Sequence, residues 1–207
     1  MFILYFCERI LTYIYMELKT RQLEIIEAAG RLLTKGGVNS LTIKNIAKEM
    51  NFSEGAVYRH FQSKEEIIVA LLRYLGAIID DRLNAIPQTD NAEQNMKNLF
   101  FEQFLFFSQH QHFVVAVFSD GLIEESKAVN EAIFSLIAIM EKHLTNIITE
   151  GQATACFNPD IPASQLVQIV LGTYKLQMFK WRLSGFSFDI HAEGSSIMSS
   201  LLLLVKS

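Results

Sequence analysis

Residues 41–65 read LTIKNIAKEMNFSEGAVYRHFQSKE, and this stretch decides the fold. Apolar residues recur at helical spacing over residues 42–50, and Thr42 can cap the helix that they predict. Asn51 stands where a tight turn between helices requires a positive φ, which Asn tolerates better than most residues. Ser53 can cap a second short helix over residues 54–60. The stretch therefore predicts two short helices joined by a tight turn.

The helical period continues on both sides of this stretch. Residues 23–35 form an apolar stripe that Gly36 and Gly37 end. Ser63 and Glu66 form a capping box before a long helix over residues 64–86, which Pro87 stops. Further helices are predicted over residues 93–109, 112–118, 126–150, 162–184 and 190–206. A strand over residues 113–118 is the alternative there, because five of the six residues favour β-structure, but no partner strand is available. The chain is therefore predicted to be all-α.

The composition indicates a folded chain with a substantial core. Of the 207 residues 50% are apolar and 19% charged, which disfavours disorder, and this length needs no disulfide or metal staple. Two cysteines fit a reducing compartment, so a cytoplasmic location is expected. The net charge of −4 is unevenly spread: residues 17–65 hold eight Lys and Arg against six acids, whereas residues 66–207 hold nine against fifteen. We therefore expect the N-terminal region to bind anions and the rest of the chain to be acidic.

The first fifteen residues, MFILYFCERILTYIY, include twelve apolar ones. This run is too short to span a membrane, and Glu8 and Arg9 interrupt it. It also lacks the basic start and the small-residue cleavage site of a secretory signal. Met16 then opens a stretch typical of an ordinary N-terminus. Residues 1–16 are therefore interpreted either as a start-site artefact or as an extra apolar helix, and no membrane partner is expected.

Two short helices that pack closely at the small Ala47 make a helix-turn-helix. Such a unit binds double-stranded DNA by placing the N-terminal residues of its second helix in the major groove. The small residues Gly55 and Ala56 would let the backbone of the second helix approach DNA closely. Lys44 could reach a phosphate or a guanine edge. Glu54 could accept from a cytosine amine or simply stabilise the helix N-terminus. The predicted DNA-binding residues are Thr42, Lys44, Ser53, Glu54, Gly55, Ala56, Tyr58, His60 and Lys64.

The pattern Leu41-Thr42-x3-Ile46-Ala47-x5-Ser53-x-Gly55-x2-Tyr58-x-His60-Phe61-x2-Lys64-Glu65 resembles the signature of the TetR family of bacterial transcriptional regulators. The match covers residues 18–75 and fixes about a dozen positions in order across three helices. Asn51 and Phe52 depart from the pattern, which has a glycine and a smaller aliphatic residue there. The resemblance implies a helix-turn-helix domain at residues 17–75, with its motif at 41–61, and an effector-binding and dimerisation domain at residues 76–207.

The resemblance also implies partners. A homodimer built on the last two long helices would bind a pseudo-palindromic operator in double-stranded DNA. The apolar residues of these helices either form that dimer or pack within one subunit: Leu166, Ile169, Val170, Thr173, Tyr174, Ile197, Leu201 and Leu204. The residues alone leave open whether the protein represses or activates transcription. Repression is the prediction.

A small, largely hydrophobic effector is expected to release this repressor from its operator. The predicted contacts are Phe104, Phe107, Tyr174, Met178 and Trp181. The alternative is a DNA-binding regulator or architectural protein of the same fold without a small-molecule effector, in which its own phenylalanines fill the pocket.

Catalysis is disfavoured by the sequence. HExxH, CxxC, GxSxG and a glycine-rich phosphate loop are all missing, and His110 and His112 would point to different faces of a helix. No cofactor and no metal site are expected, and the chain is predicted not to be an enzyme. An enzyme or small-molecule carrier on the same fold is the third hypothesis, which the intact Tyr58, His60 and Lys64 disfavour.

Overall fold

The computed structural model describes residues 18–118, 122 and 126–206, so the expectation for residues 1–16 lies outside the described residues. Within those ranges every named element is helical, and the only β-type pairing is an isolated bridge between Phe157 and Lys206. The predicted all-α class is confirmed. The elements are α2 (Thr20–Gly36), the 3₁₀ helix η1 (Val38–Ser40), α3 (Ile43–Glu49), α4 (Glu54–Tyr58), α5 (Lys64–Asn84), α6 (Ala92–Gln109), α7 (Gln111–Val117), α8 (Lys127–Ala153), α9 (Ala163–Leu183) and α10 (Ile190–Val205).

The predicted helices agree with the observed ones to within three residues at each end. The strand alternative at residues 113–118 is wrong, because α7 covers most of that segment. A short apolar run fits a buried helix as well as a buried strand, and Val114 and Ala116 of α7 are completely buried.

Contacts between residues divide the chain into two compact units. The first comprises the chain up to Asp81 together with Val115–Leu136, and the second comprises Arg82–Val114 with the chain from Ile137 onward. The predicted domain boundary between residues 75 and 76 stays a prediction.

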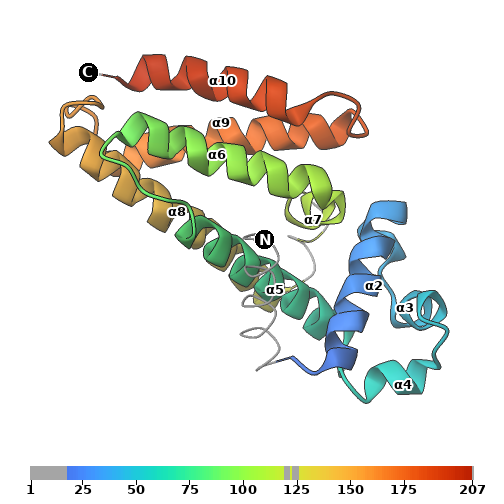
Figure 1. The fold of residues 1–207 in the computed structure, drawn as a ribbon. Coiled ribbons are helices and arrows are strands. Elements are labelled where there is room, and N and C mark those ends of the chain that lie inside the picture. The colour runs from blue at the N-terminus through green and yellow to red at the C-terminus, as the bar shows by residue number, and fades with distance from the viewer. Residues whose placement is uncertain (1–17, 119–121, 123–125, 207) are drawn as a thin grey trace. The chain divides into compact units, whose positions relative to one another are not determined.

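The helices α2, α3 and α4 form a group within the first unit. The central helix α3 contacts both α2 and α4 (Figure 1). Its inward side chains Ile46 and Ala47 are 0% and 3% exposed, and Val57 of α4 is fully buried. The small side chain at Ala47 thus lets the two short helices approach closely, as predicted.

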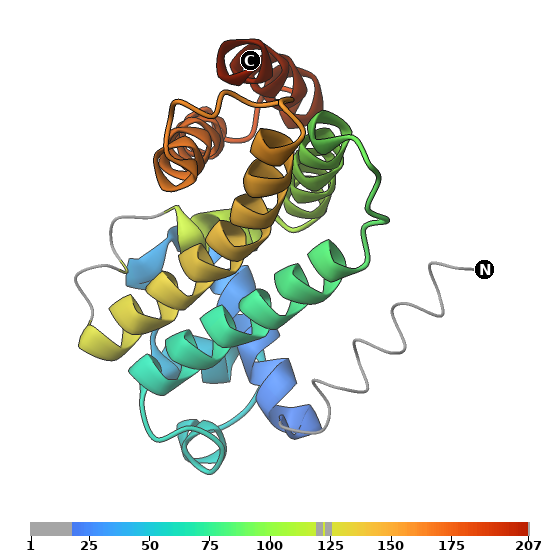
Figure 2. The ribbon, with the colours of Figure 1, turned by 90° about the vertical axis from the view of Figure 1, so that its left-hand side faces the viewer.

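In the second unit, α10 packs along both α6 and α9 (Figures 1 and 2). The buried rings of Phe100 and Phe104 on α6 lie against Tyr174 of α9, with centroids 5.4 and 5.7 Å from the tyrosine ring. Gly194 of α10 faces the Phe104 ring so closely that an added Cβ would lie 2.5 Å from it. The aromatic layer between these helices is therefore tightly packed.

Among the described helices, α8 alone is long and apolar enough, by length and composition, to cross a membrane. Core helices meet the same criterion. The second half of α8 is such a helix, because Leu144 and Ile148 are buried and Gly151 lies against the buried Phe157 ring.

We predict that Gly194→Ala destabilises the protein by about 1–3 kcal/mol, because the new methyl group overlaps a fully buried ring that has little room to move. The midpoint of thermal unfolding, followed by circular dichroism, measures the effect. Ser195→Ala changes the exposed neighbouring position and should shift stability by less than about 0.5 kcal/mol. Equal midpoints for the two variants would contradict the close approach.

Candidate DNA-binding surface and effector region

A side-chain hydrogen bond caps the N-terminus of each helix of the motif. The Thr42 hydroxyl accepts a hydrogen bond from the amide of Asn45 at 3.1 Å, at the start of α3. The Ser53 hydroxyl accepts one from the amide of Ala56 at 3.2 Å, at the start of α4. Both predicted caps are confirmed. Each hydroxyl keeps its own proton, which can be donated to a phosphate oxygen.

The turn between α3 and α4 has the backbone geometry that the sequence predicts. Asn51 has a φ of 56°, and the next amide, that of Phe52, donates to the carbonyl of Ala47 at 2.8 Å. The aromatic ring of Phe52 lies beneath the guanidinium of Arg21, which is 5.4 Å from the ring centroid. This cation–π contact explains why an aromatic residue is accommodated at this position.

The nine predicted DNA-binding residues all lie on or beside this motif and are solvent-accessible. Thr42, Lys44, Ser53, Glu54, Gly55 and Tyr58 are exposed, and Ala56, His60 and Lys64 are partly exposed. Tyr58 is 51% exposed although it is a large aromatic side chain. An added Cβ at Gly55 would meet only the Ser53 hydroxyl, at 4.0 Å, so packing within the subunit does not require a glycine there. Contact of these residues with DNA stays a prediction.

The position of α4 is fixed from both of its neighbours. Val57 points inward, and the Gln22 amide at the start of α2 donates to the carbonyl of His60 at 3.3 Å. The face of α4 that carries Glu54, Gly55 and Tyr58 is thereby held outward.

Two basic side chains of α2 are paired with a carboxylate of α3. Glu49 accepts from the Lys35 ammonium at 2.9 Å and from the Arg31 guanidinium at 3.2 Å. These partners, Lys35 before Arg31, hold the pKa of Glu49 below its usual value. The exposed Lys44, Lys48 and Arg59 supply positive charge elsewhere on the motif.

The five predicted effector-binding residues are buried in the second unit. Their exposed fractions are 0% for Phe104, 2% for Phe107, 5% for Tyr174, 0% for Met178 and 3% for Trp181. The Tyr174 hydroxyl donates to the side-chain carbonyl of Gln103 at 3.4 Å, and burial raises the pKa of this tyrosine. The Trp181 indole donates to the carbonyl of Phe188 at 2.9 Å. These side chains fill their own space, the arrangement expected of the alternative without an effector, and their role in binding stays a prediction.

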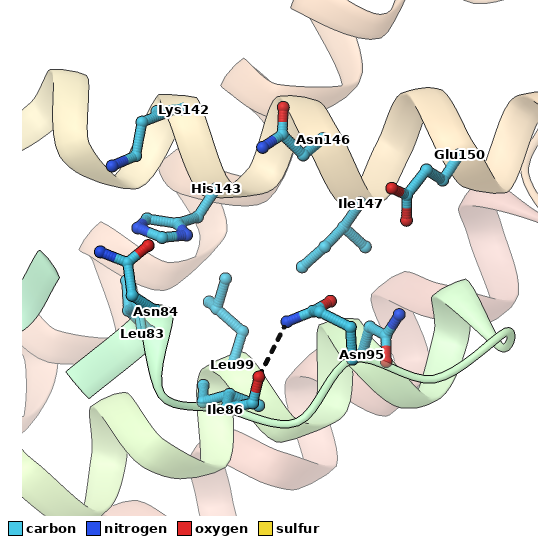
Figure 3. Close-up of a pocket in the computed structure, with 11 residues that line it drawn as sticks. Leu83, Asn84, Ile86, Asn95, Leu99, Lys142, His143, Asn146, Ile147 and Glu150 are labelled. Carbon is cyan, nitrogen blue, oxygen red and sulfur yellow. Dashed lines mark hydrogen bonds between the residues drawn. The ribbon is translucent and has the colours of Figure 1, made fainter. Parts of the chain in front are cut away.

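A cavity of about 210 Å³ lies elsewhere in the second unit, between the end of α5, the loop after it, α6 and α8 (Figure 3). None of the five predicted effector-binding residues lines it. The sequence analysis missed this cavity, although the spacing of Lys142, Asn146 and Glu150 on one face of α8 was a signal. The lining residues are Leu83, Asn84, Ile86, Gln88, Asn95, Leu99, Lys142, His143, Asn146, Ile147 and Glu150.

Metal ligation has no support in the part of the chain that the structure describes. No group of three or more His, Cys, Asp or Glu side chains is placed there to hold a metal ion. His110 instead packs against the ring of Phe106, with centroids 4.8 Å apart, and burial lowers its pKa.

Two sequence models of known families match this chain. The one described as bacterial regulatory proteins of the tetR family matches residues 25–71, and the one described as the C-terminal region of YsiA-like proteins matches residues 72–205. Together they cover the helix-turn-helix and nearly all of the remaining helices. They define a DNA-binding transcriptional regulator.

Relatives and solved structures agree with this class. The transcriptional repressor KstR2 of Mycobacterium tuberculosis is 24% identical over 191 residues, which are 90% of this chain and 93% of the relative. The fatty acid degradation regulator FadR of Bacillus halodurans has the same fold, with a TM-score of 0.81 at 18% identity over 90% of this chain and 96% of that one. FadR of Bacillus subtilis, solved in complex with stearoyl-CoA, has a TM-score of 0.77 at 18% identity over 87% and 97% of the two chains.

The chain therefore belongs to the tetR family of bacterial regulatory proteins. The predicted family and the predicted function, a ligand-responsive DNA-binding repressor, are confirmed at the level of the family. These relatives are regulators. That this chain is not an enzyme stays a prediction.

We predict that Glu49→Gln lowers the thermal unfolding midpoint at pH 7, and that it does so less and less as the pH falls below the usual glutamate pKa. A carboxylate whose folded pKa is depressed contributes stability above its unfolded pKa, and this contribution is lost as the pH falls through the folded pKa. Glu27→Gln removes an exposed carboxylate in the middle of α2, and it serves as the control. An equal loss of stability for Glu49→Gln at pH 7 and well below the usual glutamate pKa would show that the ion pairs contribute nothing.

Proposed function

We propose that the chain is a homodimeric cytoplasmic repressor that binds a pseudo-palindromic operator through α4 and is released by an apolar effector. The outward face of α4 is the observation that supports operator binding most directly. Gly55 lies in open space, Tyr58 is half exposed, and the two caps leave hydroxyl protons beside them. A glycine that folding does not require is explained by close approach of a phosphate backbone or base edge.

The proposed dimer is supported by an exposed apolar face on α9 and α10. Ile169, Leu176 and Leu183 are 47%, 59% and 68% exposed and follow one another at seven-residue intervals along α9. Ile197 and Leu204 repeat the same spacing on the adjacent α10, and they are 40% and 79% exposed. Side chains spaced in this way share one side of a helix, so each of the two helices presents an apolar stripe that a second copy can bury.

The same helices also show which apolar residues serve the fold of one subunit. Leu166, Val170, Tyr174 and Leu201 are buried, which leaves four of the predicted set for the dimer: Ile169, Thr173, Ile197 and Leu204. The exposed apolar side of α9 also includes Leu176 and Leu183, which were not among the residues predicted from the sequence.

The proposed effector has a large apolar part. FadR of Bacillus subtilis has been solved with stearoyl-CoA, and KstR2 is described as a ketosteroid regulator, so both relatives are associated with apolar molecules. In this chain the aromatic layer of α6 and α9 is the apolar region available. An effector would occupy it by displacing the rings of Phe104, Phe107 and Trp181, because those side chains now fill the space.

To test the operator contacts, the operator is first isolated as the fragments of genomic DNA that the full chain binds. These fragments then serve as the DNA in the binding measurements. We expect Tyr58→Phe to weaken binding to all sequences by about fivefold, because it removes one hydrogen bond worth about 1 kcal/mol. Lys44→Ala should weaken operator binding by about 1–3 kcal/mol and relax its sequence preference if the lysine contacts a base edge. Fluorescence anisotropy at fixed salt concentration measures both effects.

The matched control is Lys127→Ala, which removes a cation with a 92% exposed side chain outside the motif. It should change operator affinity by less than about twofold. If Tyr58→Phe and Lys44→Ala both bind the operator as tightly as this control, α3 and α4 do not form the DNA contact.

Dimerisation is tested by replacing Leu176 and Leu183 with glutamate. We expect the double variant to sediment as a monomer and to lose at least about tenfold in operator affinity, because the charges face a second copy and the two half-sites are no longer bound together. Gln168→Glu adds one negative charge at an exposed position of α9 outside this stripe and should leave the dimer intact. A dimeric double variant would contradict the proposed interface.

A further inference from the structure

Gly172 stands in the middle of α9, where the fold of one subunit gives no reason for a glycine. The residue lies inside a regular helix and its φ is not positive, so its backbone torsion suits any amino acid. An added Cβ would meet no atom within 4 Å beyond its chain neighbours and the helix backbone. Glycine is, after proline, the least favourable residue in the interior of a helix. Gly172 therefore weakens α9 without improving the packing of its own subunit.

Gly172 belongs to the exposed apolar side of α9. It follows Ile169 by three residues and precedes Leu176 by four, so the three positions share one side of the helix. Phe179 stands between Leu176 and Leu183 in the same way and is partly exposed. This alternation of three and four residues is typical of helices that pack against one another. The smallest residue of the series lies among its largest side chains.

The charges of α9 leave this side free for an apolar contact. The positions at 169, 172, 176, 179 and 183 carry no charge, whereas the exposed Lys175 and Lys180 stand beside them. Such a pattern, with an apolar centre and charges at the edge, is the usual composition of a protein interface.

The same side of α9 is complementary to itself. Gly172 lies close to the midpoint of the helix. When two copies of α9 cross there about a two-fold axis, each Gly172 faces the other, and the Ile169 of each copy comes beside the Leu176 of the other. A two-fold contact pairs one surface with an identical one, so it needs this kind of self-complementarity. A second copy of the chain therefore fits the surface.

The adjacent α10 repeats the arrangement. Ser200 stands between Ile197 and Leu204, again at three and four residues, and all three are exposed. A small side chain thus separates larger apolar ones on both of the helices that pack together here. The distance between packed helices depends on the side chains at their contact, and small ones allow a shorter distance.

We propose that α9 crosses the α9 of a second copy at Gly172, and that this glycine is the point of closest approach in the homodimer. The inference rests on the proposed function, because it concerns the same dimer. The missing Cβ lets the two helix backbones approach, and the flanking Ile169 and Leu176 then pack against the other copy. The contact in the dimer offsets the cost of a glycine inside the helix of each subunit.

Gly172→Ala tests the proposal because its effects on the dimer and on the single subunit have opposite signs. Sedimentation equilibrium of the full chain measures the dimer dissociation constant. We expect this constant to rise at least about tenfold, since a methyl group from each copy enters the crossing point. In the monomeric variant with Leu176→Glu and Leu183→Glu, the same change should raise the midpoint of thermal unfolding by about 2–4 °C, because alanine is the better helix former.

Ser199→Ala is the matched control. It also introduces a better helix former, at an exposed position of α10 that lies two residues from Ile197 and five from Leu204 and so on another side of the helix. It should change the dissociation constant by less than about twofold. The proposal is overturned if Gly172→Ala dimerises as tightly as the wild type, or if the control weakens the dimer equally. A lower unfolding midpoint for Gly172→Ala in the monomeric variant would show that the subunit itself needs the glycine, and would also overturn it.

Gly172→Cys locates the crossing point by a covalent link. The variant is made in a chain in which Cys7 and Cys156 are replaced by serine. Facing Cα atoms of two helices with axes about 8–10 Å apart are about 5 Å from each other, within reach of a disulfide. Mild oxidation with copper phenanthroline should link the two copies, as a non-reducing gel shows, whereas Ser199→Cys should stay unlinked. An unlinked Gly172→Cys would overturn the crossing point, and this measurement remains decisive if the glutamate variant does not fold.

The wild type separates failure of this inference from failure of the proposed function. If Leu176→Glu with Leu183→Glu dissociates the wild-type dimer but Gly172→Ala does not weaken it, only the crossing point is wrong. If the wild type is monomeric, or if the glutamate variant stays dimeric, the proposed interface fails together with this inference. A wild-type dimer that binds no operator would overturn the proposed regulator, while the Gly172 variants still decide the crossing point.

Discussion

The orientation of α4 depends on the left-handed backbone at Asn51. With a φ of 56°, this residue reverses the chain so that the Phe52 amide can bond to the carbonyl of Ala47. Asn adopts this region at low energetic cost, whereas a β-branched residue there would be strained. The chain then enters α4 at the Ser53 cap with Val57 turned inward. Together with the bond from Gln22 to the carbonyl of His60, this turn leaves Glu54, Gly55 and Tyr58 of α4 exposed.

The second unit depends on close packing around α6. Gly194 lets α10 approach the Phe104 ring, and Gly151 lets α8 approach the Phe157 ring and Ala92 at the start of α6. Interiors packed to this density leave no empty space for a ligand among the rings. A ligand must therefore displace aromatic side chains, use the existing cavity, or do both.

Local signals in the sequence were sufficient for the motif and its caps. Thr42, Asn51 and Ser53 each act through a backbone bond or torsion within a few residues, so a single sequence reveals them. The burial of apolar residues on α9 was not accessible in the same way. Tyr174 and Leu176 are both apolar positions on one helix, yet Tyr174 is buried and Leu176 exposed, since burial depends on where α6 crosses α9.

The cavity could not be predicted for a related reason. Its walls come from the end of α5, from α6 and from α8, and these segments are brought together only by the packing of the second unit. The face of α8 that carries Lys142 and Asn146 was visible as a polar stripe, but such a stripe usually faces solvent. Only the position of Asn84 across from it turns that stripe into one wall of a cavity.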